Sequence, residues 1–213
     1  MSSLKNIRTD YTKGSMLAKD LAACPAVQLH AWIDEADREG VKDSNAFCLS
    51  TINDSGYPTG RIVLARQIDV DGVVFYTNKN SAKVIEIKAL ANAGVTFFWA
   101  EMQRQVRLSG NVSHISEDDN DRYFASRPRE SQIGAWASSQ SEGMSSREEL
   151  EEKLSHFEDK FKELDNIPRP PHWGGYRVSI EEIEFWQGRA SRLHDRVRFN
   201  KASEGWVKCL LQP

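Results

Sequence analysis

The sequence predicts a mainly β domain, an antiparallel barrel with helices at its periphery. Three observations predict it. Short apolar stretches alternate with polar turns, helical spacing is confined to a few stretches between them, and no internal repeat or long linker interrupts the 213 residues. This length fits one ordinary domain. We therefore expect an N-terminal arm over residues 1–20, which is mixed and polar, followed by a single domain over residues 21–213.

A helix is expected to open the domain at Pro25. Leu29, Trp32 and Ala36 form an apolar stripe at helical spacing, and Gly40 stands where the helix would end. The next region has the pattern of an antiparallel meander, with polar turns between its apolar stretches. We expect strands over residues 46–52, 61–68, 73–77, 95–99 and 105–114, with a short helix over residues 81–90.

The second half of the chain combines helical and extended segments. A helix over residues 117–127 should stop before Pro128, because the residue before a proline disfavours the α region. A second helix, from Ser146, carries Leu154 and Phe161 on one face. Residues 167–175 are rich in Pro and Gly and predict an irregular linker. Strands are then expected over residues 176–180, 183–187, 193–199 and 206–210.

Composition and motifs exclude several classes of protein. The 28 basic and 31 acidic residues give a net charge of −3, so no overall basic field attracts nucleic acid or an anionic membrane. Cys24, Cys48 and Cys209 lack the spacing of a disulfide framework or a zinc site. No apolar stretch approaches the roughly 20 residues of a membrane span, and GxGxxG, GxxxxGK(S/T), GxSxG and HExxH motifs are missing. We expect a soluble, cytoplasmic protein without a metal ion.

The sharpest chemical signal is the segment RLHDR, from Arg192 to Arg196. In an extended strand, Arg192, His194 and Arg196 would share one face. Three basic groups side by side repel one another unless an anion or an acidic partner lies opposite. The pattern favours an anion-binding face, and an exposed, solvated face is the alternative.

A second cluster, Tyr123, Arg127 and Ser131, surrounds Pro128. Tyr123 and Arg127 are four residues apart and would be neighbours on a helix. Tyrosine, arginine and serine supply the donors that a phosphate group accepts. Arginines are also common at helix ends because they complement the helix dipole, so the residues alone leave both interpretations open.

A third cluster combines Arg61 and Arg66 with Tyr76, Thr77, Ser81 and Lys83. Hydroxyl groups and cations near strand ends predict a second phosphate site. In one straight strand Arg61 and Arg66 would face opposite sides, so using both requires a bend or two separate ligands.

Two glutamines, Gln105 and Gln140, carry amides that both donate and accept hydrogen bonds, which suits the pyrimidine edge of a flavin. By themselves, these clusters predict a barrel with two anion-binding sites and leave the reaction open.

Several long stretches of the chain carry a family resemblance. They are RTDYTKG (8–14), GRIVL (60–64), VFYTN (74–78), RQV (104–106), YFASRPRESQIGAW (123–136), ASSQS (137–141), WGGYRV (173–178), IEFWQG (183–188) and RLHDR (192–196). On these residues the chain resembles the pyridoxamine 5′-phosphate oxidase family along nearly its whole length. The resemblance implies a split β-barrel that binds FMN at the interface of a homodimer. It also implies an oxidase that converts pyridoxamine 5′-phosphate and pyridoxine 5′-phosphate to pyridoxal 5′-phosphate, with O2 reduced to H2O2.

The resemblance also implies roles for individual residues. The flavin-contacting positions of the family match Arg61, Ile62, Val63, Leu64, Tyr76, Thr77, Lys83, Gln105, Gln140, Ser141, Trp186 and Arg196. Positions that hold the substrate phosphate match Arg66, Tyr123, Arg127 and Ser131. Arg192 and His194 match catalytic residues that lie against the pyridine ring and align it, and Arg8 and Tyr11 match an arm that closes over the substrate.

Two positions depart from the family pattern. Arg66 stands where the family usually has Lys, which replaces a compact ammonium group by a planar fork. Ala82 stands where the family usually has Arg, which removes a cation near the FMN phosphate. We expect weaker FMN retention than in a typical member, with activity kept. Two alternatives stay open: a flavin-binding split-barrel reductase with another substrate, and a non-catalytic carrier of pyridoxal phosphate or FMN.

Overall fold

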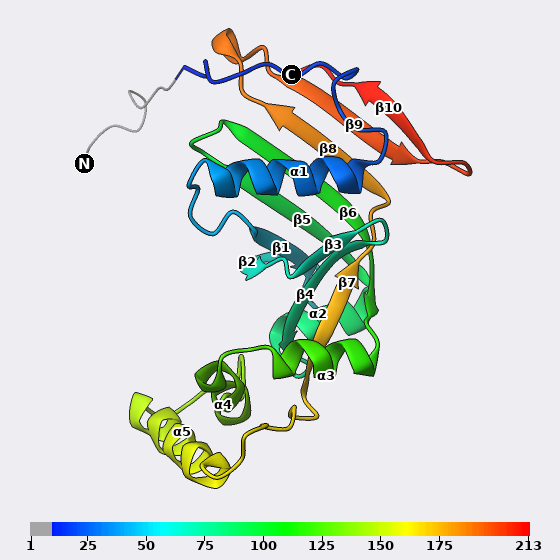
Figure 1. The fold of residues 1–213 in the computed structure, drawn as a ribbon. Helices are drawn as coiled ribbons and strands as arrows, with labels where there is room; N and C mark the ends of the chain where they lie inside the picture. The colour runs from blue at the N-terminus through cyan, green and yellow to red at the C-terminus, as the bar shows by residue number, and fades with distance from the viewer. Residues whose placement is uncertain (1–9) are drawn as a thin grey trace, which may run out of the picture.

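The computed structural model describes residues 10–213, and at its centre a ten-stranded sheet curls into a half-barrel (Figure 1). The strands are β1 (Ala46–Ile52), β2 (Pro58–Leu64), β3 (Gln67–Asp69), β4 (Gly72–Asn78), β5 (Asn92–Trp99), β6 (Arg104–His114), β7 (Trp173–Val178), β8 (Glu182–Gln187), β9 (Asp195–Lys201) and β10 (Trp206–Leu210). Seven follow the order β10–β9–β8–β6–β5–β1–β2, while β7 joins β6 to the β4–β3 pair. Every pairing is antiparallel, as predicted.

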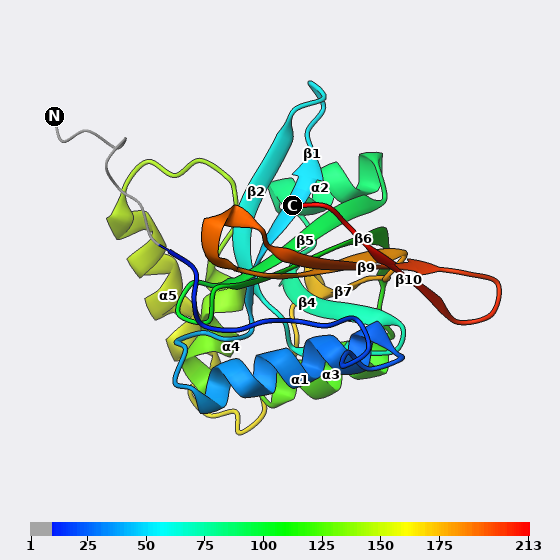
Figure 2. The same cartoon turned by 90° about the horizontal axis from the view of Figure 1, so that it is seen from above.

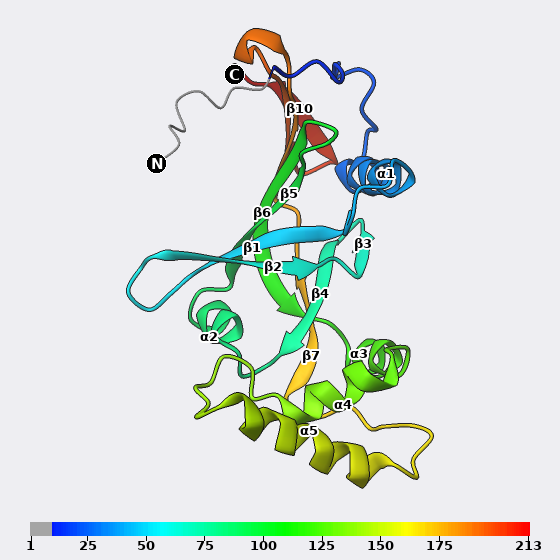
Figure 3. The ribbon, with the colours of Figure 1, turned by 90° about the vertical axis from the view of Figure 1, so that its left-hand side faces the viewer.

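Among residues 10–213, five α-helices surround this sheet: α1 (Pro25–Arg38), α2 (Ala82–Ala89), α3 (Glu117–Ala125), α4 (Arg129–Ala137) and α5 (Arg147–Phe161). Figure 3 shows α1 against one side of the sheet and the β1–β2 hairpin projecting on the other side. Figure 2 shows β9 and β10 extending from the sheet as a second hairpin. The prediction of a mainly β architecture with peripheral helices is confirmed.

The main core lies between α1 and the sheet. The Trp32 ring meets the Phe185 ring edge-on, with 5.1 Å between the ring centres, and the Trp99 ring at 6.3 Å. All three side chains are buried. Burying each such side chain stabilises the fold by roughly 1.5–3 kcal/mol. Because alternate residues of a strand face opposite sides, Glu184 and Trp186 flank Phe185 on the side of the sheet away from this core.

A smaller apolar cluster joins the helices at the other end of the molecule. It consists of Phe124, Ile133, Phe161, Ile167 and Trp173, from α3, α4, α5, the segment before β7, and β7 itself. These helices lie at the bottom of Figure 1, away from α1.

The single strand predicted over residues 61–68 is wrong, because the chain breaks between β2 and β3. At the break, Ala65 donates its backbone N–H to the carbonyl of Asn45 (2.9 Å), and Arg66 donates to that of Val74 (2.8 Å). The segment after β2 therefore changes its pairing partner from the β1 side to β4. This change supplies the bend that is needed for Arg61 and Arg66 to point into the same region.

The linker predicted over residues 167–175 is also wrong at its end, since β7 begins at Trp173. Its glycines permit the close pairing with β4. A Cβ atom on Gly175 would lie 2.5 Å from Cδ1 of Ile115 and 2.7 Å from a ring carbon of Tyr76. The Pro- and Gly-rich composition predicted an irregular segment here. The glycines instead belong to a strand that lies too close to its neighbours for a side chain.

The helix predicted over residues 117–127 ends at Ala125, and α4 after it was not predicted. Pro128 is the N-cap residue of α4, and its carbonyl accepts the first helical hydrogen bond from Gln132 (3.1 Å). A proline excludes helix before it and tolerates helix after it, so the two short helices meet at a corner.

The described part of the N-terminal arm contains neither helix nor strand up to Ala23. It is nevertheless held to the sheet, because Met16 is buried and donates its backbone N–H to Asp195 (2.9 Å). The boundary at residue 20 stays a prediction. Within residues 10–213, no helix has both the length and the apolar character needed to cross a membrane.

Candidate active site

A pocket of about 690 Å³ lies where β2, β4 and β7 meet the first turn of α2 and the helices α3 and α4. Its lining includes many of the residues predicted to hold ligands: Arg61, Ile62, Val63, Leu64, Arg66, Tyr76, Thr77, Lys83, Tyr123, Arg127, Ser131, Gln140 and Ser141. Ala82 and Trp173 also line it. Four of these residues are cations, and no acidic side chain is among the lining residues described. The pocket therefore favours an anionic ligand.

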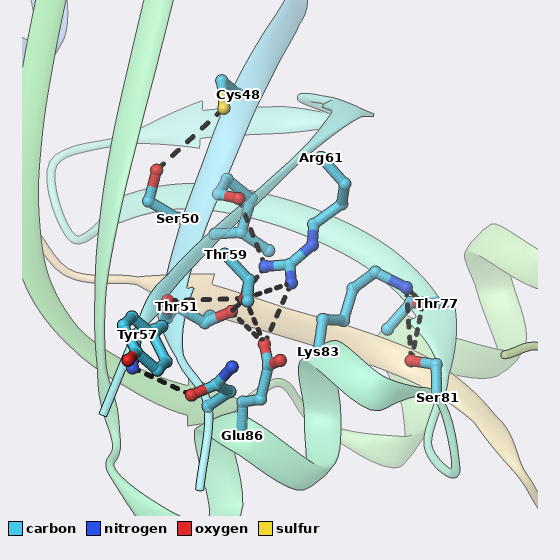
Figure 4. A network of polar contacts seen from close by, with 12 residues as sticks. Cys48, Ser50, Thr51, Tyr57, Thr59, Arg61, Thr77, Ser81, Lys83 and Glu86 are labelled. Carbon is cyan, nitrogen blue, oxygen red and sulfur yellow. Dashed lines mark hydrogen bonds and ion pairs between the residues drawn. The ribbon is translucent and has the colours of Figure 1, made fainter. Parts of the chain in front are cut away.

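Arg61 is fixed on one wall of the pocket by a network of polar contacts (Figure 4). Its Nη2 donates to Oε2 of Glu86 (2.9 Å) and to Oγ1 of Thr59 (2.8 Å). Burial alone would raise the pKa of Glu86, but hydrogen bonds from Thr51, Thr59 and Arg61 outweigh it and lower this pKa. Glu86 is thus a charged anchor for Arg61.

Lys83 is buried beside Arg61 without a carboxylate partner among the described residues. Its Nζ donates to Oγ1 of Thr77 and Oγ of Ser81, each at 3.2 Å, as Figure 4 shows. Burial, and then the charge of Arg61, lowers the pKa of Lys83. An anion bound here would raise this pKa again, because it would stabilise the buried, charged ammonium and reduce the repulsion between the two cations.

Gln140 is held with its amide in one orientation. Its Oε1 accepts from Oγ1 of Thr77 (2.9 Å) and from the backbone N–H of Asn78 (3.2 Å). Since a backbone N–H can only donate, the orientation is set, and the Nε2 group remains to donate to a ligand. Ser141, the next residue, has a φ of 73°, a left-handed conformation that is uncommon outside glycine.

Arg127 lies on aromatic rings at the opposite wall. Its guanidinium carbon is 4.9 Å from the centre of the Trp173 ring and 5.6 Å from that of Phe124. Its Nη1 is buried and has no hydrogen-bond partner in the part of the chain that the structure describes. Burial lowers the pKa of Arg127, and the nearby charge of Arg66 lowers it further. Two neighbouring cations and an unused donor are the features that suit an anion.

Aromatic rings complete this wall. The rings of Tyr76 and Tyr123 stack with 3.9 Å between their centres, and Tyr76 stacks on Trp173 at 5.1 Å. Burial, and then the charge of Asp119, raises the pKa of Tyr76 to about 12, so its hydroxyl stays protonated.

A second group of predicted residues lies elsewhere, on the outward side of the sheet. Gln105, Trp186 and Arg196 are direct cross-strand neighbours on β6, β8 and β9. The residues next to them, including Val106, Phe185 and Val197, are fully buried on the core side. The three side chains therefore form one row on the same side of the sheet.

The extended arrangement predicted for Arg192, His194 and Arg196 is wrong. Arg192 ends a short 3₁₀ turn with a φ of 62°, and β9 begins only at Asp195. The turn, rather than strand alternation, places the His194 ring against Trp186, with 4.6 Å between ring centres. Tyr11 packs edge-on against both rings, whereas Arg8 lies outside the described residues.

The His194 ring is held in one tautomer. Its Nδ1 lies 3.1 Å from the backbone N–H of Arg189, which can only donate. Nδ1 is therefore the acceptor, and the neutral ring carries its proton on Nε2. Burial, and then the charge of Arg192, lowers the pKa of His194.

The two groups do not meet within one chain. None of Tyr11, Gln105, Trp186, Arg192, His194 and Arg196 lines the pocket. Figure 1 shows the β8–β9 turn at the top of the molecule and α3 to α5 at the bottom. The predicted site residues therefore form two separate groups on this chain.

Sequence reasoning missed Glu86, which holds Arg61 in place. A signal was present, because Lys83 and Glu86 are three residues apart on α2 and face the same side of it. The sequence grouped Arg61 with Lys83, but nothing in it indicated that Glu86 would pair with Arg61, which lies on β2.

Comparisons with known proteins place the chain in one family. The family model described as pyridoxamine 5′-phosphate oxidase matches residues 33–161. A second model, described as the pyridoxine 5′-phosphate oxidase C-terminal dimerisation region, matches residues 173–213.

Curated relatives named pyridoxine/pyridoxamine 5′-phosphate oxidase span the whole chain. The relative from Synechocystis sp. is 46% identical, over 99% of this chain and 98% of its own. That from Burkholderia pseudomallei is 44% identical over the full length of both.

Two solved structures share the fold. PhzG from Burkholderia lata, in complex with tetrahydrophenazine-1-carboxylic acid, has a TM-score of 0.87 and 29% identity, and covers 95% of this chain and 100% of its own. An FMN-binding, pyridoxamine 5′-phosphate oxidase-related protein from Nostoc punctiforme has a TM-score of 0.69 over 91% of this chain and 99% of its own. At 16% identity it supports the fold alone.

Proposed function

This chain belongs to the pyridoxamine 5′-phosphate oxidase family and is an oxidase of pyridoxamine and pyridoxine 5′-phosphate; we propose that it uses FMN, works as a homodimer and reduces O2 to H2O2. The observation that carries the proposal is the cationic pocket, which Arg61, Arg66, Lys83 and Arg127 line and which has no acidic lining residue within residues 10–213. Its two anion-binding walls suit two phosphate groups, one on the cofactor and one on the substrate.

The residues at the α2 wall fit FMN. The ammonium of Lys83 and the fixed guanidinium of Arg61 would hold the phosphate, and the Nε2 group of Gln140 would donate to the flavin ring. When bound, FMN supplies the acceptor for the two electrons that leave the substrate. Ala82, in the pocket lining, offers no cation to this phosphate.

The opposite wall fits the substrate phosphate. Arg127 has an unused buried donor, Arg66 lies near it, and Tyr123 and Ser131 line the same wall. Arg192 and His194 would orient the pyridine ring, with the Nε2–H of His194 as a hydrogen-bond donor rather than a base. Tyr11 would cover the ring from the arm.

A second copy of the chain would complete each site. Trp186, Arg192, His194 and Arg196 all lie within residues 173–213, the region matched by the dimerisation model. Since these residues lie away from the pocket of their own chain, we propose that they face the pocket of the partner, together with Gln105. A cytoplasmic location also belongs to the proposal, supported by three cysteines that are all free.

Peroxide release from purified protein tests the reaction. Protein reconstituted with FMN should release H2O2 when pyridoxamine 5′-phosphate is added under air. A reductase would require a nicotinamide donor, and a carrier would bind the ligand and release nothing. Either of those results would reject the oxidase.

Mixed dimers test the shared site. Arg127→Ala and Arg196→Ala proteins should each be nearly inactive alone. If the site lies between chains, each heterodimer formed by random mixing of the two variants carries both substitutions in one of its sites. Its other site is then intact. About a quarter of all sites would then be restored. If each site lies within one chain, mixing restores no activity.

A further inference from the structure

We propose that Glu184, with the backbone carbonyl of Gln212, positions Arg196 for its contact with FMN. This inference rests on the proposed function and assigns a role to two groups outside the pocket.

Glu184 points to the outward side of β8, yet only 4% of the residue is exposed. Two arginines cover it from the neighbouring strands, Arg107 on β6 and Arg196 on β9. Nη2 of Arg107 lies 2.7 Å from Oε2 of Glu184. A carboxylate so buried is costly unless its partners are well placed, and here both oxygens are paired.

Arg196 holds Glu184 with two parallel hydrogen bonds. Its Nε donates to Oε1 (2.8 Å) and its Nη2 to Oε2 (3.0 Å). This fork-to-fork geometry fixes the plane of the guanidinium as well as its position. A lysine at this position could not form this planar pair of parallel contacts.

The end of the described chain adds a third contact. Nη1 of Arg196 donates to the carbonyl of Gln212 (2.8 Å), and the backbone N–H of Leu211 donates to the carbonyl of Arg196 (3.0 Å). Residues 211–212 thus continue alongside β9 beyond the end of β10.

Three of the five guanidinium hydrogens of Arg196 are used in this way. One hydrogen on Nη1 and one on Nη2 remain, and Arg196 lies in one row with Trp186 and Gln105. Because the side chain is already fixed, it loses little conformational freedom on binding, which favours the interaction with a ligand.

FMN titration of the apoprotein, followed by quenching of flavin fluorescence, tests the role. Glu184→Gln should weaken FMN binding roughly tenfold, since it removes a charge-assisted contact. A protein shortened to end at Leu210 should also bind FMN more weakly. The flavin of Glu184→Gln should show a more negative midpoint potential, because a loosely held Arg196 stabilises the reduced, electron-rich flavin less.

Glu182→Gln is the matched control. Glu182 lies on the same strand and side and pairs with Arg198 of β9 at 3.5 Å. It makes a similar ion pair without touching Arg196, so its FMN affinity and midpoint potential should remain those of the unchanged protein.

A double-mutant cycle separates positioning from general stability. Arg196→Lys should weaken FMN binding, and adding Glu184→Gln should then change the affinity little, because the fork is already gone. Additive losses, or a Glu184→Gln protein with unchanged FMN affinity and potential, would overturn the inference. If the unchanged protein itself fails to bind FMN, the proposed function fails instead.

Discussion

Replacing Arg127 by methionine tests whether the aromatic wall binds the substrate phosphate. Methionine keeps an apolar, unbranched side chain over Trp173 and Phe124, and removes the guanidinium with its buried, unpartnered Nη1. We expect the variant to lose recognition of the phosphate while the pyridine ring is still recognised by residues outside this wall.

The size of the loss follows from the contacts. A hydrogen bond to a charged group contributes roughly 1.5–3 kcal/mol, and about 1.4 kcal/mol corresponds to a factor of ten. The kcat/KM for pyridoxine 5′-phosphate should therefore fall about 10- to 150-fold. Stability should change little, because a lost cation–π contact of about 0.5–2 kcal/mol is offset by removal of the unpaired donor.

The assay compares pyridoxine 5′-phosphate with unphosphorylated pyridoxine. The ratio of their kcat/KM values should fall by the same factor in Arg127→Met, with the value for pyridoxine unchanged. Arg129→Met is the control, because the Arg129 guanidinium faces away and donates to the carbonyls of Phe161 (2.6 Å) and Leu164 (2.8 Å). An equal loss for both substrates in Arg127→Met would refute the reasoning.

Three further predictions concern other parts of the site. Ala82→Arg should tighten FMN binding in a titration by adding a cation to the pocket lining; an unchanged dissociation constant would reject this. Arg192→Ala should keep bound FMN and its yellow colour but lose most turnover, and near-native kcat/KM would remove its orienting role. The His194 ring should titrate below its ordinary pKa of 6.5 in an NMR experiment. Since the unfolded chain then binds this proton more readily, protonation should lower stability as the pH falls from 6.5 toward the folded pKa, and a midpoint above 6.5 would contradict this.

Local pattern was sufficient for most of the fold. Alternation and turn residues located β1, β5, β6, β8 and β10 within a few residues, and a stripe at helical spacing located α1. These patterns involve residues that are close together in the sequence, so a short stretch is enough to recognise them. The same holds for the clusters around Arg127 and Arg61, whose residue types indicated anion binding before any geometry was known.

Long-range pairing decided the rest. The break at Ala65 arises because the strand changes partners, and it brings Arg66 to the pocket that Arg61 lines. Strand β7 begins at Trp173 because β4 lies beside it, although the local composition predicts a loop.

The sequence by itself determined the class of fold and the family, and it predicted the kinds of ligand. Only the tertiary structure decided which predicted residues share a site, because a side chain's position across a sheet depends on the register of strands far apart in the chain. Register placed Gln105, Trp186 and Arg196 in one row away from the pocket, and it buried Glu184 between two arginines. Neither arrangement can be predicted from a local stretch of the sequence.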